Sequence, residues 1–214
     1  MKKYSEYDSR KLLEKYKIPI PEGILAKNGQ DAVLAANKVG YPCIMKIISP
    51  DILHKSDVGG VVINILNETQ ARDAFLKIIS SAKKQKPDAK IDGVLIEKIV
   101  IGKECIVGAS RDPQFGSILM FGLGGIFVEV LKDVTFRLIP IEKKDAHDMI
   151  REIKAYPILE GIRGEPPVDI SAIEKTLLKV SKMVQKEKIT ELDINPLIVN
   201  KDGVICADCR MIFE

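Results

Sequence analysis

A lysine, a histidine and two adjacent glycines lie close together in this sequence, and these residue types suit phosphate chemistry. Lys46 sits inside the apolar run Cys43–Ile48, where a positive charge is costly unless an anion or carboxylate is near. Gly59 and Gly60 can expose backbone N–H groups to an anion because no Cβ blocks the approach. His54 supplies a ring nitrogen able to attack phosphorus. Together they predict a phosphate site that contains a nucleophile.

Plainer explanations exist for the same residues. Lys46 could reach solvent from the end of a strand, because its aliphatic stem extends readily. Gly59 and Gly60 could form an ordinary turn. His54 could be a hydrogen-bonded loop residue, or could orient a phosphate without carrying it. Asp57, which follows closely, could orient the histidine ring or balance its charge.

A second group of polar residues lies near the end of the chain. In an extended strand, alternation puts Glu191, Asp193 and Asn195 on one face. Mg²⁺ prefers such oxygen ligands and usually completes its coordination with water and nucleotide phosphates. Cys206 and Cys209 have the C-x-x-C spacing, but in an extended strand they would point to opposite faces. We therefore do not expect these two thiols to hold a metal or to form a redox pair.

Hydrophobic periodicity and the positions of glycine and proline predict alternating helices and strands. Without a Gly-x-Gly-x-x-Gly after the first strand, this alternation favours an α/β or α+β fold over a dinucleotide-binding Rossmann domain. We expect helices at 5–16, 31–39, 67–85, 142–155 and 171–187, strands at 43–48, 61–66, 91–100, 103–109, 117–121, 189–194 and 204–207, and a loop at 157–167.

Composition limits the classes of function. The 214 residues suit one large domain or two intimately joined subdomains. The 33 basic and 30 acidic residues give a net charge of only +3, so we do not expect a nucleic-acid partner. No secretory signal and no apolar run of membrane-spanning length are present, so we expect no membrane contact and a cytoplasmic location. Four scattered cysteines suit a reducing compartment, with Cys43 and Cys105 in the core.

Four segments together carry a resemblance to a known family. These are Ile47–Val61, which contains the histidine and the glycine pair, Ile118–Arg137, Leu159–Asp169 and Glu191–Pro196. They resemble the signature segments of the β chain of ADP-forming acetyl-CoA (acyl-CoA) synthetases, which are related to the succinyl-CoA synthetase β chain. The likeness covers nearly the whole chain, and the combination is far more specific than any one glycine pair.

The resemblance implies an ATP-grasp fold, in which two α+β subdomains clamp a nucleotide. Residues 18–98 would form the smaller subdomain, and residues 1–17 with 99–214 the larger. The implied activity is acid–thiol ligation, acyl-CoA + ADP + Pi ⇌ acid + CoA + ATP, through a phosphohistidine relay. The implied cofactors are Mg²⁺ and ATP or ADP. The implied partner is a CoA-binding α subunit in an α2β2 assembly. Because that α subunit would also hold the acyl pocket, the sequence of this chain does not predict which acid is preferred.

The same resemblance assigns roles to individual residues. Lys46 would bind the nucleotide phosphates, the loop with Gly59 and Gly60 would cover them, and His54 would carry the phosphoryl group. Asn195 and Asp208 would hold Mg²⁺, while Asp193 would accept a hydrogen bond from the incoming phosphohistidine. The catalytic set expected is therefore His54, Asp193 and Asp57, the nucleotide-binding set is Lys46, Gly59, Gly60, Glu97, Glu104 and Arg137, and the metal set is Asn195 and Asp208.

Several of these assignments have alternatives. Glu97 and Glu104 flank the connection 98–102, which resembles the hinge between ATP-grasp subdomains, and Glu104 is the expected ribose ligand. Both could instead be surface glutamates on strand ends. Asp193 could instead support a metal ligand. Arg137 could contact a phosphate or form a buried ion pair. The glycine-rich run 121–129 could bind a second anion or meet a partner chain.

Two other functions compete with the relay. The chain could be a self-sufficient ATP-grasp carboxylate ligase that works through an acyl-phosphate and needs neither His54 nor a second chain. It could also be a nucleotide-sensing regulatory domain without activity of its own. Retention of Lys46, His54, Asn195 and Asp208 makes the regulatory hypothesis the weakest.

Overall fold

The computed structural model describes residues 2–4, 6–52 and 54–214, and its chain folds into two compact units. The small unit comprises residues 21–99, and the large unit comprises the residues up to 20 together with 100–214. The prediction placed the divisions at 17/18 and 98/99 instead. Each unit has its own hydrophobic core, so each can position its own functional residues.

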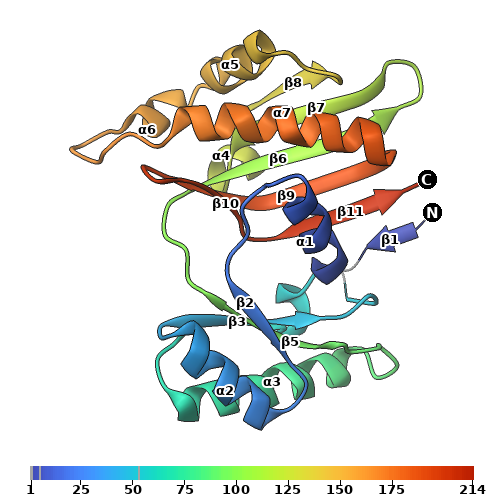
Figure 1. Ribbon diagram of the computed structural model, residues 1–214, viewed down its shortest axis with the longest axis vertical. Coiled ribbons are helices and arrows are strands. Elements are labelled where there is room, and N and C mark those ends of the chain that lie inside the picture. Colours follow the sequence, from blue (N-terminus) through green and yellow to red (C-terminus); the bar gives the residue numbers. More distant parts are fainter. Residues whose placement is uncertain (1, 5, 53) are drawn as a thin grey trace. The chain divides into compact units, whose positions relative to one another are not determined.

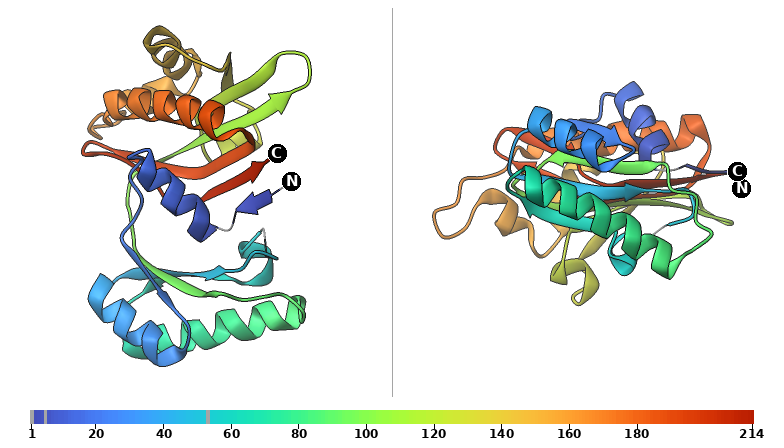
Figure 2. Two further views of the ribbon diagram at one scale, coloured as in Figure 1. Left: turned by 45° about the vertical axis from the view of Figure 1, so that its right-hand side comes forward. Right: turned by 90° about the horizontal axis from the view of Figure 1, so that it is seen from below.

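The small unit is an antiparallel sheet with two helices on one face (Figure 1). Its strands, in spatial order, are β2 (Gly23–Ala26), β5 (Gly93–Lys98), β3 (Cys43–Ile48) and β4 (Val61–Ile65), and its helices are α2 (Gly29–Val39) and α3 (Glu68–Gln85). Figure 2 shows the two helices lying side by side along this sheet. A short 3₁₀ turn, η1 (Ser56–Val58), lies between β3 and β4.

Strand alternation separates the core of the small unit from its polar residues. Met45 and Ile47 of β3 and Ile96 of β5 pack against the two helices, in one buried cluster. Because successive side chains point to opposite faces, Lys46 and Glu97 lie on the other face of the same sheet. The strand that carries the lysine is therefore fixed by a core in which the lysine takes no part.

Local hydrogen bonds explain where α3 begins. The Asn67 side chain accepts a hydrogen bond from the Gln70 backbone N–H at 3.0 Å, and the Gln70 side chain accepts one from the Leu66 N–H at 2.8 Å. This is the reciprocal arrangement of a capping box, displaced by one residue. It confirms the start that the sequence predicted for this helix.

The large unit is a seven-stranded antiparallel sheet with its main helices packed into one core. In spatial order its strands are β1 (Lys2–Tyr4), β11 (Cys209–Phe213), β9 (Ile189–Asn200), β6 (Lys103–Asp112), β7 (Gly116–Leu123) and β8 (Val134–Leu138), and β10 (Gly203–Cys206) also pairs with β9. The helices are α1 (Glu6–Lys15), α4 (Ile126–Glu129), α5 (Lys143–Glu152), α6 (Tyr156–Glu160) and α7 (Ile170–Glu187). Figure 1 shows the long helix α7 running across this sheet.

Some element predictions differ from the structure. The first four residues of the loop expected at 157–167 are helical and belong to α6. Pro157 fits there because it lies in the first turn of the helix, where a missing backbone N–H costs nothing. Strand β9 continues through Pro196 to Asn200, beyond its expected end at 194. Ser5, the expected start of the first helix, lies outside the described residues.

Candidate functional site

Lys46 forms a buried ion pair with Glu97. The Lys46 Nζ lies 2.7 Å from Glu97 Oε2, and the side chains are 9% and 0% exposed. The two residues come from neighbouring strands, where Lys46 stands opposite Leu95 and Glu97 lies diagonally across. The alternatives that made Lys46 a solvent-reaching lysine and Glu97 a surface glutamate are therefore wrong. The sequence required an anion or carboxylate near Lys46, and Glu97 is that carboxylate.

The histidine loop connects β3 to β4. His54 and Asp57 are both exposed, on either side of the start of η1, and Leu53 lies outside the described residues. Gly59 adopts the left-handed conformation with φ 64° and ψ 26°, which ends η1 and turns the chain into β4. The loop thus presents an imidazole to its surroundings, as a phosphoryl carrier requires.

The backbone N–H groups of the two glycines are not directed at an anion in this conformation. The Gly59 N–H donates to the Ser56 carbonyl at 3.0 Å, and the Gly60 N–H donates to the Lys55 carbonyl at 2.7 Å. A Cβ on Gly60 would lie 2.5 Å from Ile47 Cγ2 and 2.9 Å from the Lys55 carbonyl oxygen. The glycines are therefore needed for a tight turn, and the expectation that this loop covers a phosphate stays a prediction.

The large unit brings the two expected metal ligands together. Asn195 lies on β9 and Asp208 in the bend between β10 and β11, and the Asn195 N–H donates to the Asp208 carbonyl at 3.2 Å. An amide oxygen and a carboxylate are ligands that suit Mg²⁺. Within the residues that the structure describes, no three His, Cys, Asp or Glu side chains gather closely enough to hold a metal by themselves. The pair fits an ion that takes most of its ligands from water and phosphate.

Asp193 is exposed on β9 and lines a hollow of about 350 Å³ on the large sheet. It stands opposite Gly108 on β6 and Arg210 on β11. Arg210 also lies 3.7 Å from Glu191 Oε2. The hollow is completed by apolar side chains of β7 and β8, including Met120 and Phe136. Asp193 therefore faces a space that another group could enter.

Glu104 is exposed near the start of β6, and the glycine-rich segment lies against its backbone. The Gly124 N–H donates to the Glu104 carbonyl at 2.7 Å, and a Cβ on Gly124 would lie 3.1 Å from that oxygen. Glu104 thus lies on a strand, β6, that is paired with β9 on one side and β7 on the other. Its assignment as a ribose ligand stays a prediction.

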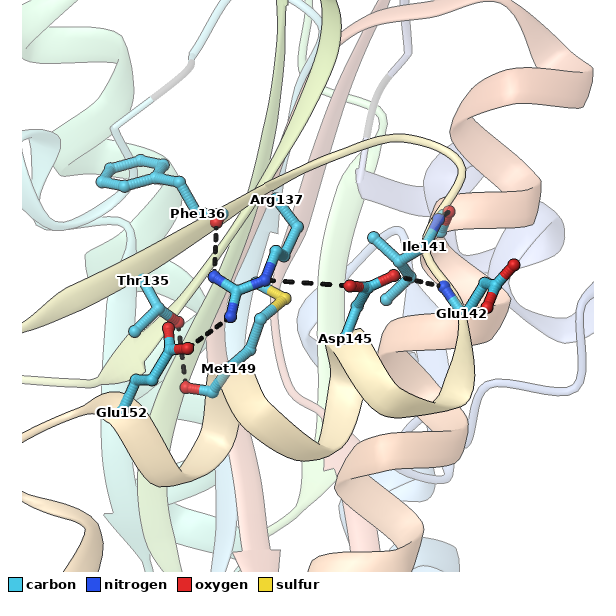
Figure 3. Close-up of polar contacts among 9 residues, drawn as sticks. Thr135, Phe136, Arg137, Ile141, Glu142, Asp145, Met149 and Glu152 are labelled. Carbon is cyan, nitrogen blue, oxygen red and sulfur yellow. Dashed lines mark hydrogen bonds and ion pairs between the residues drawn. The ribbon is translucent and has the colours of Figure 1, made fainter.

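Arg137 is held by carboxylates of α5 (Figure 3). Its guanidinium donates to Glu152, lies 3.9 Å from Asp145, and donates to the Phe136 carbonyl at 2.9 Å. The hydrogen bond with Glu152 raises the pKa of Arg137 above its usual value. The ion-pair alternative therefore describes its contacts, although the side chain is 26% exposed rather than buried. The phosphate role of Arg137 stays a prediction.

The two cysteines of the C-x-x-C segment differ from expectation. Cys206 ends β10 and Cys209 begins β11, so a bend and not an extended strand separates them. Burial raises the pKa of the Cys209 thiol well above its usual value, and a hydrogen bond with Cys206 raises it further. The thiols are thus neighbours, and the prediction of opposite faces is wrong. Cys43 and Cys105 lie in the two cores, as predicted.

Comparison with known proteins gives a consistent result. A family model described as an ATP-grasp domain matches residues 2–213. The beta subunit of acetate–CoA ligase [ADP-forming] I from Pyrococcus furiosus is 52% identical over 209 residues, which cover 97% of this chain and 90% of the relative. This chain is an ATP-grasp protein of the ADP-forming acetate–CoA ligase β-subunit family. The fold expected from the resemblance is confirmed.

Other relatives of this family differ in length or have been solved with ligands. Acetate–CoA ligase [ADP-forming] I of Archaeoglobus fulgidus is 48% identical over 94% of this chain, which spans only 30% of that relative. A structure of Ca. Korarchaeum cryptofilum acetyl-coenzyme A synthetase 1 with coenzyme A, Ca-AMPCP and HgCl⁺ has a TM-score of 0.95 and 42% identity, covering 100% of this chain and 94% of that one.

A second structure of that Korarchaeum protein holds coenzyme A and Mg-AMPPCP, with its phosphohistidine segment pointing towards the nucleotide binding site. It has a TM-score of 0.85 and 39% identity, over 100% of this chain and 93% of that one. None of the helices in the described part of the present chain combines the length and apolar composition needed to span a bilayer.

The sequence alone did not reveal two pairings of residues on neighbouring strands of this chain. It did not join Glu97 to Lys46, and it gave no role to Arg210, which stands opposite Asp193. Both pairings depend on strand register, which a single sequence shows poorly. The one available signal was the costly charge of Lys46 inside an apolar strand, which required a partner but did not name it.

Proposed function

We propose that this chain is the nucleotide-binding subunit of an ADP-forming acetate–CoA ligase, catalysing acyl-CoA + ADP + Pi ⇌ acid + CoA + ATP with a CoA-binding partner. The observation that carries the proposal is the 52% identity, over 90% of its length, to a beta subunit of that name. The exposed His54, the Lys46–Glu97 pair and the adjacent Asn195 and Asp208 supply residue types that the reaction needs.

His54 is the phosphoryl carrier in this proposal. A neutral ring nitrogen of His54 attacks the phosphorus of the partner's phosphohistidine, and the P–N bond to the partner breaks as the new one forms. A phosphate oxygen of ADP then attacks the same phosphorus, which forms ATP and returns His54 to its neutral state. Asp57 orients or charge-balances the ring, and Asp193 accepts a hydrogen bond from the partner's imidazole.

Lys46, Glu104, Asn195 and Asp208 hold the nucleotide in this proposal. Lys46 binds phosphate oxygens and Glu104 the ribose hydroxyls. Asn195 and Asp208 hold Mg²⁺, which when bound neutralises the phosphate charge. The metal assignment is supported by the oxygen-only ligand pair and by the backbone hydrogen bond that joins the two segments.

The assembly is an α2β2 hetero-oligomer in the cytoplasm. Some relatives are single long polypeptides of which this chain matches about a third. The remaining two thirds of such a relative support the proposal that the reaction needs protein segments beyond the nucleotide-binding part. In the present case those segments would be supplied by a separate α chain. Cell fractionation and a mass measurement of the co-purified complex test the location and the stoichiometry.

The test is the substitution His54→Ala in the complex reconstituted with the α partner. We expect ATP formation from acetyl-CoA, ADP and phosphate to fall by at least about a hundred-fold, since general-base and nucleophilic groups contribute on that order. Acid-labile, base-stable phosphate on this chain should also disappear. His147→Ala is the matched control, because His147 is exposed and lies 3.1 Å from Glu174 on an outer helix pair.

Near-normal ATP formation by the His54→Ala complex would contradict the relay. Turnover by the isolated chain without any partner would favour the self-sufficient carboxylate ligase instead. A complex that binds ADP but never forms phosphohistidine on this chain would leave His54 as a residue that only orients phosphate.

A further inference from the structure

Glu97 is the more deeply buried member of its ion pair with Lys46. Its side chain is 0% exposed, whereas the Lys46 side chain is 9% exposed. The carboxylate is therefore poorly placed to meet a nucleotide that arrives from solvent, and the ammonium is the member nearer to the surface. An ammonium carries three N–H donors, so it can hold a carboxylate and a phosphate at the same time.

The space that Glu97 occupies is created by a glycine on the neighbouring strand. Gly23 of β2 stands directly opposite Glu97 of β5. A Cβ on Gly23 would lie 2.9 Å from Glu97 Cγ, closer than real contacts allow, and 3.3 Å from the Ile96 carbonyl oxygen. The φ of Gly23 lies outside the left-handed region, so its backbone conformation is open to alanine. The glycine is therefore needed for room beside Glu97.

A lysine side chain has a long flexible stem, and holding its ammonium in one place costs conformational entropy. The buried Glu97 carboxylate at 2.7 Å already holds the Lys46 ammonium in one place, so nucleotide binding does not have to order this side chain. In protein kinases a Lys–Glu ion pair has the same effect on a phosphate-binding lysine. A glutamate that only positions its lysine would affect nucleotide affinity through that lysine alone.

We propose that Glu97 is a positioning residue that fixes Lys46 for the nucleotide phosphates, and that Gly23 maintains nucleotide affinity by leaving room for Glu97. This inference rests on the proposed function, because it takes Lys46 as a phosphate ligand. It replaces direct contact between Glu97 and the nucleotide, which the resemblance implied.

The test measures binding of ADP with Mg²⁺ to the full chain by calorimetry, well below the unfolding temperature of each variant. The variants are Gly23→Ala, Lys46→Met, Glu97→Gln and the double variant K46M/E97Q. We expect Gly23→Ala to weaken ADP binding about ten-fold, and the two single charge variants to weaken it by at least that factor. Because Glu97 acts through Lys46, the double variant should bind ADP no more weakly than Lys46→Met.

The matched control is Gly29→Ala in the same unit. A Cβ on Gly29 would meet Arg72 Cγ and Phe75 Cδ1 at 3.9 Å, an ordinary contact, so ADP affinity should stay within about two-fold. Both Gly→Ala substitutions reduce the conformational entropy of the unfolded chain by the same amount. A difference in ADP affinity between the two variants therefore reports the contact with Glu97. Should Glu97→Gln fail to fold, Gly23→Ala and the charge-neutral double variant still decide the question.

The outcomes separate this inference from the proposed function. Normal ADP binding by Lys46→Met would remove the phosphate role of Lys46, and the proposed site with it. Weak binding by Lys46→Met alone, with Gly23→Ala and Glu97→Gln binding normally, would overturn only the positioning role. A double variant weakened by the product of both single effects would show that Glu97 contacts the nucleotide directly. A lower melting temperature with unchanged affinity would make the pair purely structural.

Discussion

At the residue scale, the decisive feature is a charge inside an apolar strand. Lys46 stands between Met45 and Ile47, which are both fully buried, so the position demanded a compensating group. Glu97 supplies it at 2.7 Å. A buried pair of this kind is weak evidence for stability, because desolvating two charges offsets most of their attraction. Its presence is better explained by function than by folding.

This explanation predicts that removing one charge of the pair lowers the stability of the fold, and that removing both charges restores most of it. Glu97→Met should destabilise the chain by about 3–5 kcal/mol, because it leaves the Lys46 ammonium buried without its carboxylate. The double variant K46M/E97M should recover most of that loss, since it removes both charges and keeps similar volumes. Urea unfolding of the three proteins measures both effects. A double variant as unstable as Glu97→Met would show that the pair stabilises the fold.

At the element scale, polar contacts join the first helix to the last long one. Lys15 Nζ and the Tyr16 hydroxyl both donate to Glu187 Oε1 at 2.8 Å, which ties α1 to the end of α7. The hydrogen bond from Lys15, and then that from Tyr16, lowers the pKa of Glu187. Burial, followed by the hydrogen bond with Glu187, raises the pKa of Tyr16 to about 12.

The direction of the Glu187 shift sets the expected pH dependence. A carboxyl whose pKa is lower in the folded chain stabilises above its unfolded pKa, about 4.3, and loses that contribution as pH falls through the folded value. Glu187→Gln should therefore cost about 0.2–1 kcal/mol at pH 7. The difference should begin to shrink as pH falls through the unfolded pKa and should disappear once pH is below the folded pKa of Glu187. The pKa of Tyr16 should also fall, as ultraviolet titration of tyrosinate would show.

The control for this substitution is Asp202→Asn, whose exposed pair with the adjacent Lys201 should contribute almost nothing. A Glu187→Gln difference that persists unchanged in acid would contradict the assignment.

At the scale of the whole molecule, the two units divide the candidate residues between them. The small unit carries Lys46, Glu97 and His54, and the large unit carries Asp193, Asn195 and Asp208. Each set is fixed by its own core and its own sheet. The proposed nucleotide role therefore has to be tested in the full chain, and the proposed acyl chemistry in the presence of the α partner.

Assembly with that polypeptide is the prediction at this scale. Co-expression with a CoA-binding α chain should yield a complex with the mass of two copies of each chain, measured by light scattering. Activity should appear only in the mixture, because the proposed relay takes its phosphoryl group from a histidine of the partner. Activity of the 214-residue chain alone, or purification without any companion, would contradict this prediction.

Much of the fold and of the candidate site could be read from single residues and short patterns. Alternation and periodicity placed β3 at Cys43–Ile48 and α3 as far as Gln85, and the signature segments identified the family. These features are local, because a strand's alternation or a helix cap depends on neighbours a few residues away. The need for an anion or carboxylate beside Lys46 was equally local, since it follows from its apolar flanks alone.

Only the tertiary structure decided which residues meet across strands. It joined Glu97 to Lys46, placed Gly23 opposite Glu97, turned the Gly59 and Gly60 amides onto backbone carbonyls, and brought Cys206 beside Cys209. Strand register and bends set these contacts. A shift of one residue in register would move every side chain to the other face without changing the sequence, so only the folded chain could show them.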